Sequence, residues 1–250
     1  MTGRNGAIST FAALTLTLCF SATMVAQPTG NIRSIRHYTV KAERTGDLAA
    51  AIKEANAIYK KAGREKPIVI WRSLTGPTEL LRVDYYEKFA DLDAEADPKM
   101  KPFEAEYAVI VRRILDSFAK SERVIDVVLP DLSLPRAATP PKMLMVWTAR
   151  IKMDKAREFY ELEKNEFLPA MKNAGVHSYS FARTRFGGPN GEVRSAVGLN
   201  NWAELDGPSL VRKGMGDKYA AYVAKVEGLL EEYRYDIYRL DQDLSYIPMK

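Results

Sequence analysis

Hydrophobic and polar positions follow two different periods along the first half of the chain, and these periods predict six consecutive elements. Runs rich in β-branched and aromatic residues favour strands over residues 38–44, 68–73, 79–86 and 124–129. Apolar residues at helical spacing favour helices over residues 47–61 and 103–120. Gly63 follows the first helix as a C-terminal cap, and Gly76 and Pro77 form a turn between the second and third strands. The expected order is β-α-β-β-α-β.

The same pattern returns in the second half of the chain. Its strands, helices and hairpin turn are expected over residues 144–151, 154–173, 187–191, 218–231 and 233–240. Gly63 recurs as Gly175, 112 positions later, whereas Asp93 recurs as Asp206, 113 positions later. We therefore expect one extra residue in the second hairpin turn. A duplication of this kind indicates two folding units that bury their open faces against each other.

A proline-rich segment separates the two units. Pro135, Pro140 and Pro141 stiffen the chain and remove amide hydrogens, which is typical of a linker. The expected organisation is a signal peptide over residues 1–26, an N-terminal lead over 27–36, a first unit over 37–133, a linker over 134–142, a second unit over 143–246 and a tail over 247–250.

The N-terminal residues have the composition of a secretory signal peptide. Arg4 is the only charge, an apolar run covers residues 11–20, and small residues lead to Ala26, after which we expect cleavage. An uncleaved anchor is the alternative, but the Ser and Thr residues within this stretch make it a poor permanent span. The sequence therefore predicts an exported protein, periplasmic or extracellular, with no membrane span after cleavage.

Composition narrows the chemistry further. The 250 residues are 46% hydrophobic and 28% charged, as in ordinary globular proteins, and the formal charge of +5 is spread along the chain. Without a basic stripe or a nucleic-acid motif, no nucleic-acid partner is expected. Cys19 is the only cysteine and lies in the signal segment, so neither disulfides nor thiol catalysis are expected. No metal-binding motif is present, and we expect neither a metal site nor a built-in cofactor.

The duplicated order resembles the dimeric α+β barrel superfamily, in which two ferredoxin-like β-α-β-β-α-β units set their sheets together as one barrel. Residues 192–210, a strand followed by Asn201, Trp202, Ala203, Glu204 and Leu205, resemble the strand-to-helix crossing of antibiotic biosynthesis monooxygenase domains and NIPSNAP proteins. The resemblance covers residues 37–246 and implies an α+β fold. It also implies that the barrel closes within one chain, so we expect a monomer or a homodimer through outer edges.

The resemblance does not identify a reaction, because members of this superfamily include cofactor-independent monooxygenases, haem enzymes and proteins without known activity. Trp202 has Phe89 as its counterpart in the first unit, which favours a packing role. Of the two histidines, His177 follows a helix-ending glycine, where it could serve as a haem ligand or as an exposed loop residue. His37 opens the first strand and is expected to be structural. No pair of carboxylates has a spacing that identifies a general base, so no catalytic residue is assigned.

Positions that differ between the two copies are our candidates for a ligand cavity. Alignment of the copies pairs Trp71 with Arg183 and Tyr85 with Gly198, and strand alternation places Tyr179 and Phe181 on the same face as Arg183. The candidate residues are Trp71, Tyr85, His177, Tyr179, Phe181 and Arg183. If these faces point into the barrel, aromatic rings and a guanidinium suit a planar or acidic organic ligand. The alternative is that Trp71 and Phe181 are core and Arg183 pairs with a carboxylate.

Three functions follow from these observations, and whether the protein is an enzyme stays open. The first is an exported barrel protein that binds a small planar or acidic organic molecule without catalysis. The second is a cofactor-independent monooxygenase-like enzyme that uses the barrel cavity. The third is a haem-binding protein with His177 as the ligand.

Overall fold

The computed structural model describes residues 30–93, 97–135 and 140–248, and it contains the two predicted β-α-β-β-α-β units. The first unit consists of β1 (Ile32–Val40), α1 (Thr45–Lys61), β2 (Val69–Ser73), β3 (Glu79–Tyr86), α2 (Glu104–Asp116) and β4 (Phe118–Val128). The second begins with β5 (Met143–Ile151), α3 (Ala156–Leu162), a π-helical turn (Glu163–Phe167) and α4 (Leu168–Asn173). It continues with β6 (Tyr179–Phe186), β7 (Glu192–Leu199), α5 (Leu210–Met215), α6 (Tyr219–Leu229) and β8 (Leu230–Leu240). The expected signal peptide lies outside the described residues.

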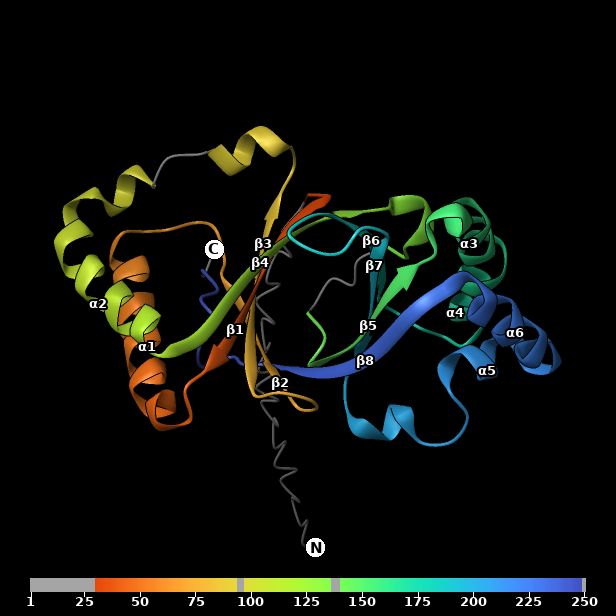
Figure 1. The fold of residues 1–250 in the computed structure, drawn as a ribbon. Coiled ribbons are helices and arrows are strands. Elements are labelled where there is room, and N and C mark those ends of the chain that lie inside the picture. Colours follow the sequence, from red (N-terminus) through yellow and green to blue (C-terminus); the bar gives the residue numbers. More distant parts are fainter. Residues whose placement is uncertain (1–29, 94–96, 136–139, 249–250) are drawn as a thin grey trace, which may run out of the picture.

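The eight strands form one closed antiparallel barrel in the order β1-β3-β2-β8-β5-β7-β6-β4. The two units meet where β2 pairs with β8 and where β4 pairs with β6. Helices α1 and α2 cover one side of the barrel, and α3 to α6 cover the opposite side (Figure 1). The predicted α+β barrel, built from tandem ferredoxin-like units, is confirmed. Closure removes every free sheet edge from the eight strands, so a single chain completes the architecture.

Several predicted boundaries of the first unit differ from the structure. Strand β1 begins at Ile32, inside the expected N-terminal lead, and residues 42–44 form a helical turn instead of strand. Helix α2 ends at Asp116 and not at residue 120, because Phe118 already belongs to β4 and stacks on Tyr38 of β1 with ring centroids 4.1 Å apart. The apolar spacing of Phe118 fits a helix, but cross-strand stacking determines its conformation.

The C-terminal segment after β8 packs on the first unit, although its sequence position suggests the second. The backbone of Tyr246 pairs with Ile68, and both Leu244 and Tyr246 are buried in the core under α1 and α2. Asn56 of α1 donates a hydrogen bond to the carbonyl of Leu244 at 3.0 Å. Residues 241–246 therefore tie the second unit to the outer face of the first.

Three apolar cores hold the molecule together. One lies between the first sheet and α1 and α2, and a second, rich in aromatic residues, lies between the second sheet and its helices. The third fills the barrel and draws on both units, from Ile35, Val69, Trp71, Leu81, Val83, Val124 and Tyr238. Because the third core contains side chains of both sheets, burial of apolar area in the barrel stabilises the association of the two units.

Candidate functional site

Polar side chains flank the apolar interior of the barrel on both sides. Along β1, the inward-facing residues are Arg33, Ile35 and His37, so the apolar Ile35 lies between two polar positions. Each polar position belongs to a cluster that includes side chains of the second unit. These two clusters are the candidate sites.

The first cluster consists of His37, Glu79 and Tyr238. The Nδ1 atom of His37 lies 3.4 Å from Oε2 of Glu79, and the Tyr238 hydroxyl donates to Oε1 at 2.7 Å. The side chains of His37 and Glu79 are 17% and 15% exposed, so both are partly accessible to solvent. Tyr238 of β8 is buried and joins the second unit to this pair.

The electrostatics of the first cluster orient the imidazole. Burial alone would raise the pKa of Glu79, but the hydrogen bonds from His37 and Tyr238 outweigh it and hold the pKa below its usual range. An ionised carboxylate can only accept, so we assign the ring proton of His37 to Nδ1. The Nε2 atom then carries a lone pair and can accept a proton from a bound molecule.

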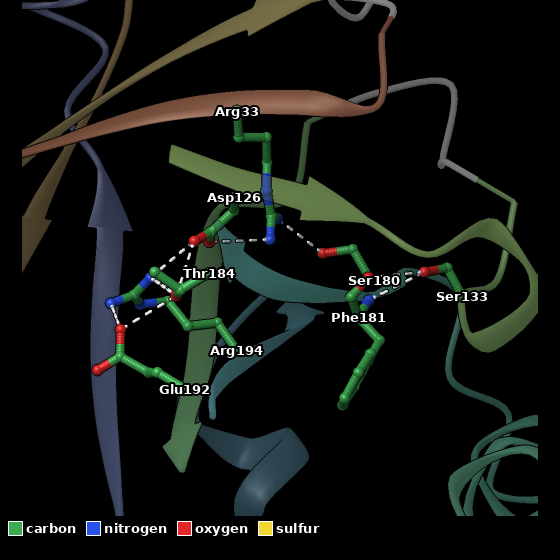
Figure 2. Close-up of polar contacts among 8 residues, drawn as sticks. All are labelled: Arg33, Asp126, Ser133, Ser180, Phe181, Thr184, Glu192 and Arg194. Carbon is green, nitrogen blue, oxygen red and sulfur yellow. Dashed lines mark hydrogen bonds and ion pairs between the residues drawn. The ribbon is translucent and has the colours of Figure 1, made fainter. Parts of the chain in front are cut away.

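The second cluster, which we call the Asp126 network, is buried more deeply (Figure 2). Its members come from both units and are Arg33, Asp126, Ser180, Thr184, Glu192 and Arg194. Oδ1 of Asp126 accepts hydrogen bonds from Thr184 at 3.0 Å and from Nη1 of Arg194 at 2.8 Å. Arg194 also pairs with Glu192. Two guanidiniums and two carboxylates therefore balance each other where β1 and β4 meet β6 and β7.

Part of the Asp126 network lacks hydrogen bonds. Nη2 of Arg33 lies 3.6 Å from Oδ2 of Asp126, which makes an ion pair without a hydrogen bond. Within the described part of the chain, Oδ2 of Asp126 and Nε of Arg33 have no hydrogen-bond partner. Arg33 is instead held by Ser180, whose hydroxyl accepts from Nη1 at 3.1 Å. Further along β6, the Ser133 hydroxyl accepts from the amide of Phe181 at 2.9 Å (Figure 2).

The two clusters occupy equivalent places in the duplicated scaffold. Glu79 and Glu192 are the first residues of β3 and β7, the third strands of their units. Asp126 of β4 is opposite Arg33 of β1, and Tyr238 of β8 is opposite Leu144 of β5. Asp126 and Tyr238 therefore hold equivalent positions in the last strands of the two units. One of these places thus carries a partly exposed His-Glu-Tyr cluster, whereas the other carries a closed ionic network.

The predicted ligand-cavity residues divide into three environments. Trp71 is buried in the barrel core, and Tyr85 packs against the same core. Tyr179 and Phe181 are buried on the opposite face of their sheet, in the core under α3, α4 and α6. Arg183 and His177 are exposed, the latter in the connection between α4 and β6. The structure brings only Trp71 and Tyr85 together inside the barrel.

The alignment of Trp71 with Arg183 is wrong by one residue. Leu80, the second residue of β3, opposes Arg72, whereas Val193, the second residue of β7, opposes Arg183. The second turn therefore has two extra residues instead of the expected one, and Trp71 corresponds to Ala182. A shift of one residue moves side chains to the other face of a strand, which explains why Phe181 and Arg183 do not line the barrel.

A third polar group lies outside the barrel and was not predicted from the sequence. Glu163, in the π-helical turn, is 3% exposed and accepts hydrogen bonds from Tyr179 and Tyr222, both at 3.2 Å. Burial raises its pKa to about 8, although these two hydrogen bonds oppose the shift. The burial of Glu163 could have been predicted from its spacing in the sequence. It lies four residues from both Phe159 and Phe167, on the apolar side of the helix.

The haem ligand predicted from the sequence, His177, is exposed in the loop between α4 and β6. The space between the second sheet and its helices is filled by aromatic side chains, including Phe159, Phe181 and Tyr222. Among residues 30–93, 97–135 and 140–248, no three His, Cys, Asp or Glu side chains are grouped to hold a metal ion.

Comparison with known proteins identifies the fold. No model of a protein family matches the sequence, and no curated protein sequence matches it. A proposed monooxygenase from Lactobacillus acidophilus NCFM has a TM-score of 0.58 at 12% identity, over 87% of this chain and 96% of its own. An anthrone oxidase-like protein has a TM-score of 0.56 at 9% identity, over 89% of this chain and 95% of its own.

A third solved structure, a single-residue variant of the chlorite dismutase of Candidatus Nitrospira defluvii, has a TM-score of 0.53 at 9% identity. The alignment covers 87% of this chain and 95% of that protein. At such identities the similarity shows the fold alone. The chain therefore has the dimeric α+β barrel fold, with both ferredoxin-like units in one polypeptide.

Proposed function

We propose that this protein binds a small planar, weakly acidic organic molecule beside His37 and removes a proton from it. The observation that carries the proposal is the partly exposed chain from Tyr238 through Glu79 to His37. General bases of this kind accelerate reactions by about 10²–10⁴-fold. Trp71, in the core beside this chain, supplies an aromatic surface in the same barrel.

The names of the structural neighbours support oxidation as the reaction that follows. They include a proposed monooxygenase and an anthrone oxidase-like protein. The resemblance of residues 192–210 to antibiotic biosynthesis monooxygenase domains and NIPSNAP proteins points in the same direction. Loss of a proton turns an anthrone into an electron-rich anion, which dioxygen oxidises. Anthrone and O₂ together give anthraquinone and water, so the overall reaction needs no added cofactor.

The role of His37 can be tested with anthrone as the probe. In an anaerobic assay, the absorbance of the anthrone anion measures proton removal. In a separate assay with oxygen present, an oxygen electrode measures oxidation. We expect His37→Gln to lower both rates by about 100-fold, because the base is lost. Glu79→Gln should lower them less and change the pH profile, since it releases the imidazole from its orientation.

The second histidine of the chain provides a matched control. His177 is exposed in a loop, so His177→Gln should leave both rates unchanged. Equal rates for the His37→Gln and His177→Gln proteins, with both shown to be folded by circular dichroism, would contradict the role of His37. Wild-type protein that neither binds nor deprotonates anthrone would contradict this substrate class.

We also propose that the protein is exported and works as a monomer. The composition of residues 1–26 supports export. As a separate finding, none of the helices in the described ranges could serve as a membrane span. The closed barrel within one chain supports a monomer. Expression in a bacterial host followed by mass spectrometry of the periplasmic fraction should give a mature protein that begins at Gln27. Protein that retains Met1 in that fraction would contradict cleavage.

A further inference from the structure

A ligand-sized cleft lies on the outside of the barrel, where β2 and β8 join the two units. Its volume is about 490 Å³, and it is lined by Arg72, Lys142, Arg239, Leu240, Asp241, Gln242 and Asp243. Volumes of roughly 300–1,000 Å³ are typical of small-molecule sites. The lining differs from the barrel interior, because most of its side chains are charged.

Two arginines face each other across this junction. Arg72 of β2 and Arg239 of β8 are directly opposed in the antiparallel register. Like charges at directly opposed positions destabilise a strand pair. The junction is also short, with three opposed pairs between residues 71–73 and 238–240. A negative group between these guanidiniums would therefore stabilise the place where the barrel closes.

The protein supplies only part of that negative charge. Nε and Nη2 of Arg72 both donate to Oδ2 of Asp241, at 3.1 and 2.7 Å. The other carboxylate oxygen of Asp241 accepts from the amide of Leu244 at 3.1 Å. Asp241 is thus fully engaged by Arg72 and the C-terminal segment, and it does not neutralise Arg239.

Two positively charged side chains of the cleft, Arg239 and Lys142, are available to bind a ligand. The side chains of Arg239 and Lys142 are exposed, and neither forms an ion pair or hydrogen bond with another described residue. The carbonyl of Lys142 accepts from the amide of Leu240 at 2.9 Å, which fixes this lysine next to the end of β8. The cleft therefore presents Arg239, Lys142 and the remaining Nη1 group of Arg72 from three separate segments.

We propose that this cleft binds a small organic anion with at least two anionic oxygen groups, either carboxylates or phosphates. One group binds between Arg72 and Arg239, and the second pairs with Lys142. Asp243 on the lining disfavours ligands that place negative charge near it, which gives the site selectivity. Because the cationic side chains come from both units, the bound anion holds the barrel closed.

The test uses calorimetric titration of the full protein with citrate and with pyrophosphate, at low ionic strength. We expect at least one probe to bind with a Kd below about 1 mM, more weakly as salt is added. The tighter of the two probes identifies carboxylate or phosphate as the preferred group. The absence of binding by both probes at several millimolar would overturn the proposal.

Matched variants show whether the anion binds in the cleft or is attracted by the net positive charge of the protein. Arg239→Gln and Lys142→Gln should each weaken binding by roughly tenfold, because each removes one charge-assisted contact. Arg212→Gln removes the same charge from an exposed position on α5 and should change Kd by less than about twofold. Equal effects of Arg239→Gln and Arg212→Gln would overturn the site. The His37→Gln protein should bind the anion normally, which makes this result independent of the proposed reaction.

Discussion

Replacement of Asp126 by Asn is expected to lower the free energy of unfolding by about 3–5 kcal/mol, the usual cost of removing one partner from a buried ion pair. The Asp126 side chain is 0% exposed and accepts from both Thr184 and Arg194. Without this charge Arg33 loses its ion pair, and among the described residues its hydrogen-bond partner is then the neutral Ser180. The same change leaves Arg194 with Glu192 as its single counter-charge.

Urea unfolding of the two proteins, followed by circular dichroism, measures this difference. Asp47→Asn is the matched control, since Asp47 forms an exposed ion pair with Arg44 and its loss should cost less than about 1 kcal/mol. An Asp126→Asn protein within 1 kcal/mol of the wild type would mean that the network contributes little to closure. Simultaneous replacement of Asp126, Arg33 and Arg194 by apolar residues should restore part of the loss, because no uncompensated charge then stays buried.

The two barrel junctions, β4–β6 and β2–β8, are connected by different side-chain contacts. At the β4–β6 junction, Asp126 and its partners connect the units through a closed ionic network. At the β2–β8 junction, the connection inside the barrel is the hydrogen bond from Tyr238 to Glu79. The more deeply buried charged network thus lies at one junction, and the partly exposed His37 cluster lies at the other.

The sequence predicted the element order because each unit must bury the same apolar faces. Gly63 and Gly175 each follow a helix and have positive φ angles of 64° and 78°, which explains their value as alignment points. These glycines do not determine which strand face enters the barrel. That choice depends on the length of the hairpin turn, and the second turn has one residue more than the aligned glycines indicated.

The candidate site was harder to predict than the fold, because its residues come from separate strands. His37, Glu79 and Tyr238 lie in β1, β3 and β8, and nothing in their spacing indicates that the barrel joins them. We expected His37 to be structural, since it opened the predicted first unit. The observed β1 begins at Ile32, six residues before the predicted strand, which places His37 well inside the strand and facing the barrel.

Glu163 is expected to make the protein less stable as the pH rises from about 5 to about 8.5. Burial raises the pKa of this carboxyl to about 8 in the folded protein, against 4.5 for an ordinary glutamate. Below pH 4.5 both states hold the proton, and the stabilisation is fully present. Between these two values only the folded state holds it, so unfolding releases a proton and stability falls with pH. The full loss amounts to about 4–5 kcal/mol.

Glu163→Gln isolates this contribution, because the amide keeps the shape of the neutral carboxyl and does not ionise. The variant should match the wild type near pH 5 and exceed its free energy of unfolding by several kcal/mol near pH 8.5, since other titrating groups cancel in the difference. Glu161→Gln, at an exposed position on the same helix, should follow the wild-type profile. Parallel profiles for Glu163→Gln and the wild type would show that Glu163 is ionised in the folded protein. Tyr179 and Tyr222 would then donate to a buried carboxylate, and the π-helical turn would be a site that stabilises negative charge.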